Sequence, residues 1–573
     1  MGRLALWFCC FSSFAAAPSI TRVEPPNWWA GQALSEIRLL VQGTDLKDAQ
    51  VSASRGMEIL ESRTNDTGTY LFVEAKIHRA GSFELKVHTK DGSAQAPFEV
   101  LTPMPKAGRF QGLSRKDLIY MIMPDRFSDG DPSNNKDADP ANPTAYHGGD
   151  FQGIINQLGY LKDLGVTAIW LTPVCENDVA YHGYHAVDFY AIEKHFGTLA
   201  KFSELVEKAH QAGIKVILDM VMNHTAPTHP WVKNPPLPDW FHGTPEHHLN
   251  ETYQIWTLLD PHAGPAMRNP VLDGWFANQL PDLNQDEPEV SRYLIQNTLW
   301  WIASSGIDAI RADTLPYVPR QFWHDWSAAI KKEYPNFRVV GEVFDGDPGV
   351  VSFFQGGDKG FDGVDTGIDS LFDFPLYGPL RRAFAEAKPV PDLAYITAHD
   401  SLYRDADDLV TFLGNHDVPR FMSENGATIE GLKLAFTYLF TTRGIPMIYY
   451  GDELAMRGGA DPDNRKDFPG EPKTDEQRDM LEFVRRLAQL RQTTPELQTG
   501  KLTQVGVSKD AYVFRRGELI VMINNGGQPV KIEAEAAPGT WKDLLDKVGN
   551  IPVHEHSMIV TVPPRSAAIM KQR

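Results

Sequence analysis

Short apolar runs typical of buried strands alternate with amphipathic segments between residues 118 and 450. Eight such runs occur, at residues 118–123, 167–171, 215–220, 309–312, 338–342, 370–374, 409–413 and 447–450. Apolar residues recur at helical spacing in several of the intervals, for example at residues 202–212, 290–304, 321–333 and 430–441. Eight strand–helix alternations fit a closed parallel barrel better than an open doubly wound sheet. The sequence therefore predicts an α/β fold built on a (β/α)₈ TIM barrel.

Two regions with β-type alternation flank the barrel, which is assigned to residues 106–490. Residues 18–105 have the short alternating runs of a small Ig-like β-sandwich and end in a proline-rich linker. Residues 491–573 predict a second, C-terminal β-sandwich. The interval between the third and fourth barrel strands is too long for a structureless loop, so an inserted subdomain B is expected at about residues 224–285.

The N-terminus predicts export. Met1-Gly2-Arg3 precedes an apolar run at residues 4–14 and three alanines, which is the pattern of a secretory signal at residues 1–17. The run is too short for a membrane anchor, so we expect a periplasmic or secreted protein without stable membrane insertion. Cys9 and Cys10 lie in this segment, and Cys175 alone would remain, so no internal disulfide is expected.

Net charge limits the class of partner. The chain carries a formal charge of −19 and has no cluster of lysine and arginine, which argues against nucleic acid as a partner. An acidic surface is compatible with a neutral polyol ligand but does not imply one.

Polar residues close or follow several of the predicted barrel strands, where barrel enzymes place their chemistry. Five such strings occur: His182-Gly183-Tyr184-His185 after the second strand, Asp219-Met220-Val221-Met222-Asn223-His224 at the third, Arg311-Ala312-Asp313 at the fourth, Gly341-Glu342 at the fifth and Asn415-His416-Asp417 after the seventh.

These strings, in this order, resemble the sequence regions of the α-amylase family, glycoside hydrolase family thirteen, over roughly residues 112–470. Residues 451–470 and the string Val23-Glu24-Pro25-Pro26-Asn27-Trp28-Trp29 look like the cyclomaltodextrinase and neopullulanase group. The resemblance implies a retaining hydrolase that cleaves α-1,4-glucosidic bonds in cyclomaltodextrins, maltooligosaccharides or related glucans. It leaves a homodimer open, because the N-terminal domain of relatives often covers a partner's active site.

The catalytic residues implied are Asp313, Glu342 and Asp417. Arg311 and Asp313 are two apart on a strand, so both side chains point the same way and the guanidinium can hold the carboxylate ionised as a nucleophile. Glu342, one strand along, is placed to protonate the leaving oxygen, which requires a raised pKa. The resemblance makes Asp417 a ligand of sugar hydroxyls that helps to distort the ring.

The resemblance also implies a set of sugar-binding residues. It makes His224 and His416 hydrogen-bond partners of the sugar and Tyr184 a stacking platform, and Arg311 is counted with them. His182 is equally compatible with a loop histidine satisfied by backbone. Arg465 is equally compatible with a donor-side contact and with a surface salt bridge.

A loop rich in oxygen side chains follows the first strand. Asp129, Asp131, Asn134 and Asn135 suit Ca²⁺, which takes 6–8 oxygen ligands from flexible loops. The loop resembles the calcium loop of neopullulanase-like members, in which the positions matching Gly148 and Asp150 complete the shell. The alternative is a solvated acidic loop.

Three rival functions remain at this point. A transglycosylase or an α-1,6 branch-point hydrolase would use the same three acids, although Thr314 after the nucleophile resembles α-1,4-acting relatives. A non-catalytic sugar-binding barrel would be expected to lack one of the acids, and all three are present.

Overall fold

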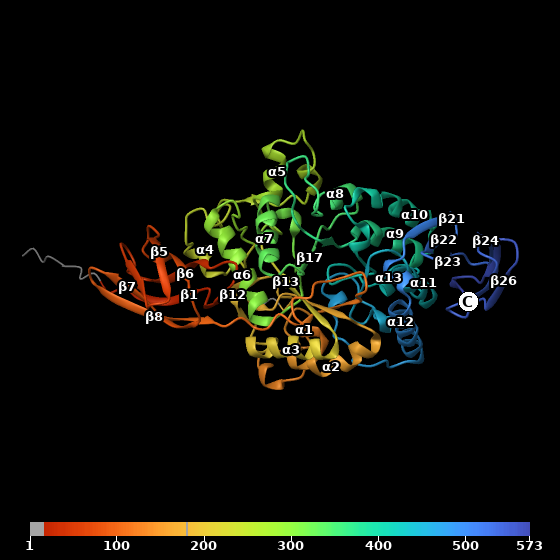
Figure 1. Cartoon of the computed structure of the whole chain (residues 1–573), viewed down its shortest axis with the longest axis horizontal. Helices are drawn as coiled ribbons and strands as arrows, with labels where there is room; N and C mark the ends of the chain where they lie inside the picture. The colour runs from red at the N-terminus through yellow and green to blue at the C-terminus, as the bar shows by residue number, and fades with distance from the viewer. Residues whose placement is uncertain (1–15, 179–180) are drawn as a thin grey trace, which may run out of the picture. The chain divides into compact units, whose positions relative to one another are not determined.

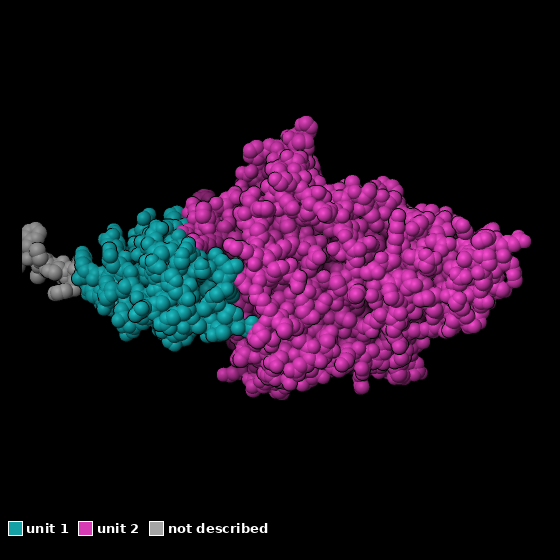
Figure 2. Space-filling model, in the orientation of Figure 1, with its two compact units in different colours: residues 1–104, 234–238 teal, residues 105–233, 239–573 magenta. Residues whose placement is uncertain are grey.

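The computed structural model describes residues 16–178 and 181–573. The predicted signal segment falls outside these ranges except for its last two residues, and Cys9 and Cys10 lie outside them. The chain divides into two compact units, residues 1–104 with 234–238 and residues 105–233 with 239–573 (Figure 2).

The first unit is formed by two four-stranded sheets. One has the strand order β1 (Ser19–Glu24), β3 (Glu36–Thr44), β6 (Tyr70–Ile77) and β5 (Met57–Thr64), and the other β2 (Asn27–Trp29), β8 (Gly92–Leu101), β7 (Gly81–Thr89) and β4 (Gln50–Ala53). Alternate side chains are buried along β7, as expected for a sheet with one face on a core. The rings of Trp28 and Trp29 are both buried and meet edge to face at 6.0 Å, so both belong to this core.

The second unit contains the predicted barrel. Its strands are β9 (Ile119–Ile122), β10 (Ala168–Leu171), β13 (Lys215–Met220), β16 (Ala309–Ala312), β17 (Arg338–Gly341), β18 (Ser370–Leu371), β19 (Val410–Phe412) and β20 (Ile445–Tyr449). All neighbouring pairs are parallel, in the order β18-β17-β16-β13-β10-β9-β20-β19. A parallel bridge between Phe372 and Val410 joins the two ends. The sheet therefore closes on itself, and the predicted (β/α)₈ fold is confirmed.

Helices lie around the barrel strands, with α2 and α3 next to each other along one side (Figure 1). The longer ones are α2 (Phe151–Leu164), α3 (Leu199–Ala212), α6 (Pro288–Ser305), α7 (Arg320–Glu333), α9 (Phe374–Phe384), α11 (Ile429–Thr441) and α12 (Asp475–Thr493), and shorter ones are α1 (Pro124–Phe127), α8 (Pro348–Ser352), α10 (Pro391–Thr397) and α13 (Pro495–Thr499). Both α2 and α3 end at a glycine in the left-handed conformation, at Gly165 and Gly213. Over the ranges described here, no helix is both long and apolar enough to cross a membrane.

Two excursions from the barrel build the rim above the strand ends. After β10 the chain forms a hairpin of β11 (Cys175–Asn177) and β12 (Ala186–Ile192), which the sequence pattern did not predict. The interval after β13 holds the short elements of the predicted insert: α4 (Pro230–Lys233), β14 (Leu249–Asn250), η2 (Ile255–Leu258), α5 (Pro265–Leu272) and β15 (Gly274–Trp275).

The C-terminal strands belong to the same compact unit as the barrel. A six-stranded sheet has the order β21 (Leu502–Val507), β22 (Ala511–Arg516), β23 (Leu519–Asn524), β28 (Ser566–Gln572), β25 (Gly539–Asp543) and β26 (Asn550–Val553), and a pair is formed by β24 (Val530–Glu535) and β27 (Ser557–Val562). Ile520, Met522 and Trp541 are among the buried side chains of this sheet core.

Candidate active site

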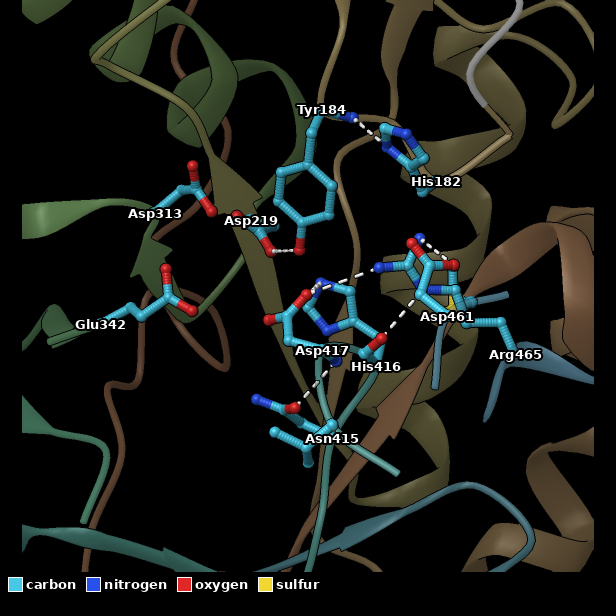
Figure 3. A network of polar contacts seen from close by, with 12 residues as sticks. His182, Tyr184, Asp219, Asp313, Glu342, Asn415, His416, Asp417, Asp461 and Arg465 are labelled. Carbon is cyan, nitrogen blue, oxygen red and sulfur yellow. Dashed lines mark hydrogen bonds and ion pairs between the residues drawn. The ribbon is translucent and has the colours of Figure 1, made fainter. Parts of the chain in front are cut away.

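A cavity of about 560 Å³ opens where the barrel strands end. Asp313 directly follows β16, Glu342 directly follows β17 and Asp417 lies on the loop after β19, and all three line this cavity. In Figure 3 Asp313 and Glu342 lie on one side, and Tyr184, His416 and Asp417 lie across from them. The predicted acids therefore converge on one space from three different strands. The other predicted residues that line it are His182, Tyr184, His224, His416 and Arg465.

The buried side chain of Arg311 holds the carboxylates together from behind. Its Nη1 pairs with Asp219 at 3.0 Å and contacts Asp313, and its Nη2 pairs with Glu342 Oε1 at 2.6 Å. Because one guanidinium spans Asp313 and Glu342, these two acids are close neighbours facing the same cavity. Arg311 itself does not line the cavity, so the structure assigns it to the carboxylates and not to the substrate, contrary to its place among the predicted sugar ligands.

Thr314 gives the two acids different partners. Its backbone N–H donates to Glu342 Oε2 at 3.1 Å, and its hydroxyl donates to Asp313 Oδ2 at 3.0 Å. Burial raises the pKa of Glu342, and the neighbouring charge of Asp313 adds to the rise, whereas Arg311 opposes it. Glu342 is thus biased toward the protonated form that a general acid requires.

Asp417 lies among nitrogen donors on the opposite side of the cavity. Its Oδ1 lies 3.2 Å from His416 Nε2 and 3.5 Å from Arg465 Nη2. Removal from bulk water raises the pKa of Asp417 to about 7, with a further contribution from the charge of Glu342 and opposition from the two arginines. The arrangement suits a carboxyl that exchanges hydrogen bonds with hydroxyl groups of a ligand.

An aromatic and imidazole surface adjoins these acids. The ring of Tyr184 stacks on His416 at 5.2 Å and 5°, and its hydroxyl donates to Asp219 at 2.8 Å. Desolvation lowers the pKa of His416 and His182 well below the ordinary value, and lowers that of His224 to about 3. The three imidazoles are therefore neutral, and a neutral ring can donate through one nitrogen and accept through the other.

His182 and Arg465 each had two interpretations. His182 Nδ1 accepts from the backbone N–H of Tyr184 at 3.1 Å, and its ring also lines the cavity, so a sugar contact for this residue stays a prediction. Arg465 is 8% exposed, with its Nε donating to the His416 carbonyl at 2.8 Å and its Nη1 3.2 Å from Asp461. A surface salt bridge is therefore the wrong description of Arg465.

The cavity also has an aromatic wall that the sequence motifs did not predict. Tyr253 and Phe276 come from the insert, Tyr317 follows Asp313 by four residues, and Phe344 follows Glu342 by two. The insert's richness in aromatic residues was the available signal, but it does not tell which rings face the cavity. Of the tryptophans there, Trp231 and Trp240 are buried and Trp256 does not line the cavity.

The predicted calcium loop lies beside the N-terminus of α2. Asp150 caps α2 by accepting from the Gly153 N–H at 2.6 Å, and its Oδ2 also accepts from Asn134 Nδ2 at 3.2 Å. Asn135 Nδ2 donates to Asp129 at 2.7 Å. The Oδ1 atoms of Asn134 and Asn135 are buried and accept no hydrogen bond from the described residues. These oxygens are the type that a hard cation binds.

Two further observations concern the same loop. The carboxylate of Asp131 accepts from the Ser133 hydroxyl, two residues on, at 2.6 Å, and Asp131 is an exposed residue. Gly148 has φ +99°, and a Cβ there would lie 2.8 Å from the Asn135 side chain, so only glycine fits. Within residues 16–178 and 181–573, no three His, Cys, Asp or Glu side chains converge as a metal cluster, so amide oxygens would have to supply part of any shell.

Comparison with known proteins gives concordant matches. The model "Alpha amylase, catalytic domain" matches residues 121–485, and "Cyclomaltodextrinase, N-terminal" matches residues 22–102. The chain is 35% identical over 479 residues to a Beta/alpha-amylase of Paenibacillus polymyxa, in an alignment that covers 79% of this chain but 38% of that relative. The aligned region thus spans well under half of that protein.

Two other relatives match over most of their length. A cyclomaltodextrinase of Thermoanaerobacter pseudethanolicus is 31% identical over 480 residues, covering 79% of this chain and 77% of the relative. The crystal structure of an Anoxybacillus α-amylase superposes with a TM-score of 0.70 at 36% identity, covering 80% of this chain and 97% of that one. Because the catalytic-domain match alone extends over more than half of the sequence, the chain belongs to the α-amylase family of glycoside hydrolases.

Proposed function

We propose that the protein is a retaining hydrolase of α-1,4-glucosidic bonds in cyclomaltodextrins, maltooligosaccharides and related short glucans. The observation that carries the proposal is the shared guanidinium of Arg311, which brings Asp313 and Glu342 to the same wall of one cavity. Retaining enzymes need two carboxyl groups about 5–5.5 Å apart, whereas inverting enzymes leave room for a water between them.

The chemistry follows from the different surroundings of the two acids. Asp313 attacks the anomeric carbon and forms a covalent glycosyl enzyme, while protonated Glu342 gives its proton to the leaving oxygen. Glu342, now a carboxylate, takes a proton from water, and that water releases the sugar from Asp313 with net retention. Arg311 positions both acids throughout.

The opposite side of the cavity binds the sugar whose bond is cleaved. Tyr184 presents a ring face for stacking against the apolar face of a pyranose. Neutral His224 and His416 exchange hydrogen bonds with hydroxyl groups, and Asp417 with Arg465 binds further hydroxyls. These groups hold the sugar against Asp313.

Two observations support short or cyclic glucans as substrates. Residues 22–102 match the cyclomaltodextrinase N-terminal domain, and an aromatic wall of Tyr253, Phe276, Tyr317 and Phe344 lines the cavity. We expect kcat/KM for γ-cyclodextrin and maltooligosaccharides to be at least about tenfold higher than for starch or pullulan. A tenfold difference corresponds to about 1.4 kcal/mol, which one or two contacts with an aromatic ring can supply. Proton NMR of the first products is the measurement, and α-anomers are expected. Initial release of β-anomers would exclude the double displacement, and faster cleavage of pullulan would exclude the substrate assignment.

We also propose that the loop after β9 binds a structural Ca²⁺ through Asp129, Asn134, Asn135 and Asp150. The buried, unsatisfied amide oxygens of Asn134 and Asn135 support the proposal. The ion would bind these oxygens and stabilise the loop that leads into α2, and no step of the reaction requires it.

Removal of calcium should lower the melting temperature on the order of 5 °C, because a ligand at about 100 times its Kd adds about 2.7 kcal/mol to stability. The same shift should be absent in Asn135→Ala, which already lacks one ligand. Asp131→Asn is the matched control, since its carboxylate faces Ser133, and it should keep the calcium-dependent shift. Equal melting temperatures with EDTA and with Ca²⁺ in the unchanged protein would exclude the site.

A further inference from the structure

We propose that Tyr253, fixed in place by the buried side chain of Glu251, forms the acceptor platform of the active site and sets how the glycosyl enzyme divides between water and a glucan hydroxyl. The inference rests on the proposed function and adds to it the residues that decide between hydrolysis and transfer.

Tyr253 reaches the cavity from the insert. Its ring is 50% exposed and meets Phe276 edge-on at 5.7 Å and Tyr317 edge-on at 6.2 Å. Phe276 and Tyr317 meet each other at 5.2 Å, so the three rings form one continuous wall, and all three line the cavity. Tyr253 is the most exposed of the three aromatic residues and offers its ring face to a ligand.

The wall lies on the side of Glu342. Tyr317 ends η3 (Leu315–Tyr317), and the residues at the start of this turn donate to Glu342: Thr314 N–H to its carboxylate at 3.1 Å and Leu315 N–H to its carbonyl at 3.1 Å. Glu342 must face the oxygen that leaves, because it protonates that oxygen. Through Tyr317 the wall adjoins the space of the leaving group, which the acceptor enters in the second step. Phe276, the ring behind Tyr253, also stacks on His224 at 5.5 Å, so the wall extends from the leaving-group side toward the bound sugar.

Glu251 fixes the backbone of Tyr253. The side chain of Glu251 is buried at 5% exposure, and its Oε1 accepts from the Tyr253 N–H at 2.6 Å. Tyr253 has φ +56°, a left-handed conformation that residues other than glycine seldom adopt. The second oxygen, Oε2, is buried and has no hydrogen-bond partner among the described residues. Burying a carboxyl group costs free energy, and the left-handed backbone adds to that cost, so the rest of the insert must compensate for keeping this turn.

A second hydrogen bond fixes the ring itself. The Tyr253 hydroxyl accepts from the Ala277 N–H at 3.1 Å. Ala277 and Asn278 also have left-handed φ angles, of 52° and 59°. The platform is thus anchored at its backbone and at its tip. A ring that is already immobile loses little entropy when a sugar stacks on it, which favours a sugar acceptor over water.

The test uses α-maltosyl fluoride as donor and maltose as acceptor. Fluoride is too small to touch the aromatic wall, so the glycosyl enzyme forms without help from it. Transfer gives maltotetraose, and hydrolysis gives maltose that carries the isotopic label of the donor and so differs from the added maltose. The ratio of these two products measures how the glycosyl enzyme divides between transfer and hydrolysis. Both products arise from the same glycosyl enzyme, so their ratio does not depend on how fast a variant forms that intermediate.

Tyr253→Ala should lower the transfer-to-hydrolysis ratio by about tenfold and raise the maltose concentration for half-maximal transfer by a similar factor. Trp256→Ala is the matched control. This exposed aromatic residue lies three positions along the same insert and does not line the cavity, so the ratio should stay within about twofold of the unchanged protein. An unchanged ratio in Tyr253→Ala would overturn the inference.

Glu251 is tested as a positioning residue by rescue. Glu251→Gln keeps an oxygen acceptor for the Tyr253 N–H, so its ratio should stay within about twofold, whereas Glu251→Ala should fall toward the Tyr253→Ala value. Equal ratios in Glu251→Ala and the unchanged protein would overturn the positioning role. If Glu251→Ala does not fold, the positioning role is overturned when Glu251→Gln has a transfer-to-hydrolysis ratio as low as that of Tyr253→Ala. Absence of fluoride release by the unchanged protein would refute the proposed function instead.

Discussion

Asp313→Asn should lower kcat on maltooligosaccharides by at least about 10⁴-fold, the scale of losses seen when a nucleophile is removed. An amide cannot attack the anomeric carbon at a useful rate, so the first step stops. The amide keeps nearly the same volume, its one oxygen can still accept from Arg311, and its NH₂ can donate to the Thr314 hydroxyl, so the fold and the clamp on Glu342 should survive. Reducing-end release from maltotriose, with circular dichroism as a check on folding, is the measurement.

A surface carboxylate supplies the control for Asp313. Asp475, at the start of α12, has a side chain that is 97% exposed, and Asp475→Asn should leave kcat within about twofold. Turnover by Asp313→Asn equal to that of the control would remove Asp313 from the mechanism, and rescue of Asp313→Asn by azide with an inverted product would support it.

Glu342→Gln should lower kcat/KM on glucans by about 10²–10⁴-fold, the usual contribution of a general acid–base. The pH profile should change in a defined direction. Because burial raises the pKa of Glu342, the protonated acid persists to higher pH than an ordinary glutamate allows, and activity declines as pH rises through that pKa. Glutamine does not titrate, so this alkaline limb should be absent from the variant.

The dependence of the Glu342→Gln rate on the leaving group distinguishes loss of the general acid from a general distortion of the active site. Fluoride needs little proton assistance, so the glycosylation step of Glu342→Gln with α-maltosyl fluoride should be slowed far less than that with maltotriose. Equal losses on both donors, or an alkaline limb that remains in the variant, would show that Glu342 is not the proton donor.

The sequence predicted the barrel because its strands are buried on both faces and therefore stand out as apolar runs. It predicted Asp313 and Glu342 because strand ends meet at one edge of a barrel, whereas the role of Asp417 came from the resemblance to the α-amylase family. The two-residue spacing of Arg311 and Asp313 indicated a shared face, but the additional contacts of Arg311 to Asp219 and Glu342 depend on neighbouring strands. Those contacts turned a predicted sugar ligand into a positioning residue.

Other features depended on tertiary structure that local pattern does not encode. The hairpin β11–β12, which carries Tyr184 into the site, is short and lacks a clear alternation. Tyr253 faces the cavity from a left-handed backbone held by Glu251, 33 residues after β13 ends at Met220. In the loop after β9, where calcium is proposed, the sequence could not show that Asp131 accepts from Ser133. It could not show either that the amide oxygens of Asn134 and Asn135 accept no hydrogen bond from the described residues.

The central claim is that Asp313 forms a covalent bond to the sugar while Glu342 serves it as acid and base. Glu342→Gln with α-maltosyl fluoride isolates this step, because glycosylation proceeds and the water that should release the sugar is no longer activated. Peptide mass spectrometry after acid quench should find one maltosyl unit on the peptide containing Asp313, and none in the Asp313→Asn, Glu342→Gln double variant. A maltosyl unit on another residue, or complete absence of adduct while β-maltose is released, would contradict the mechanism.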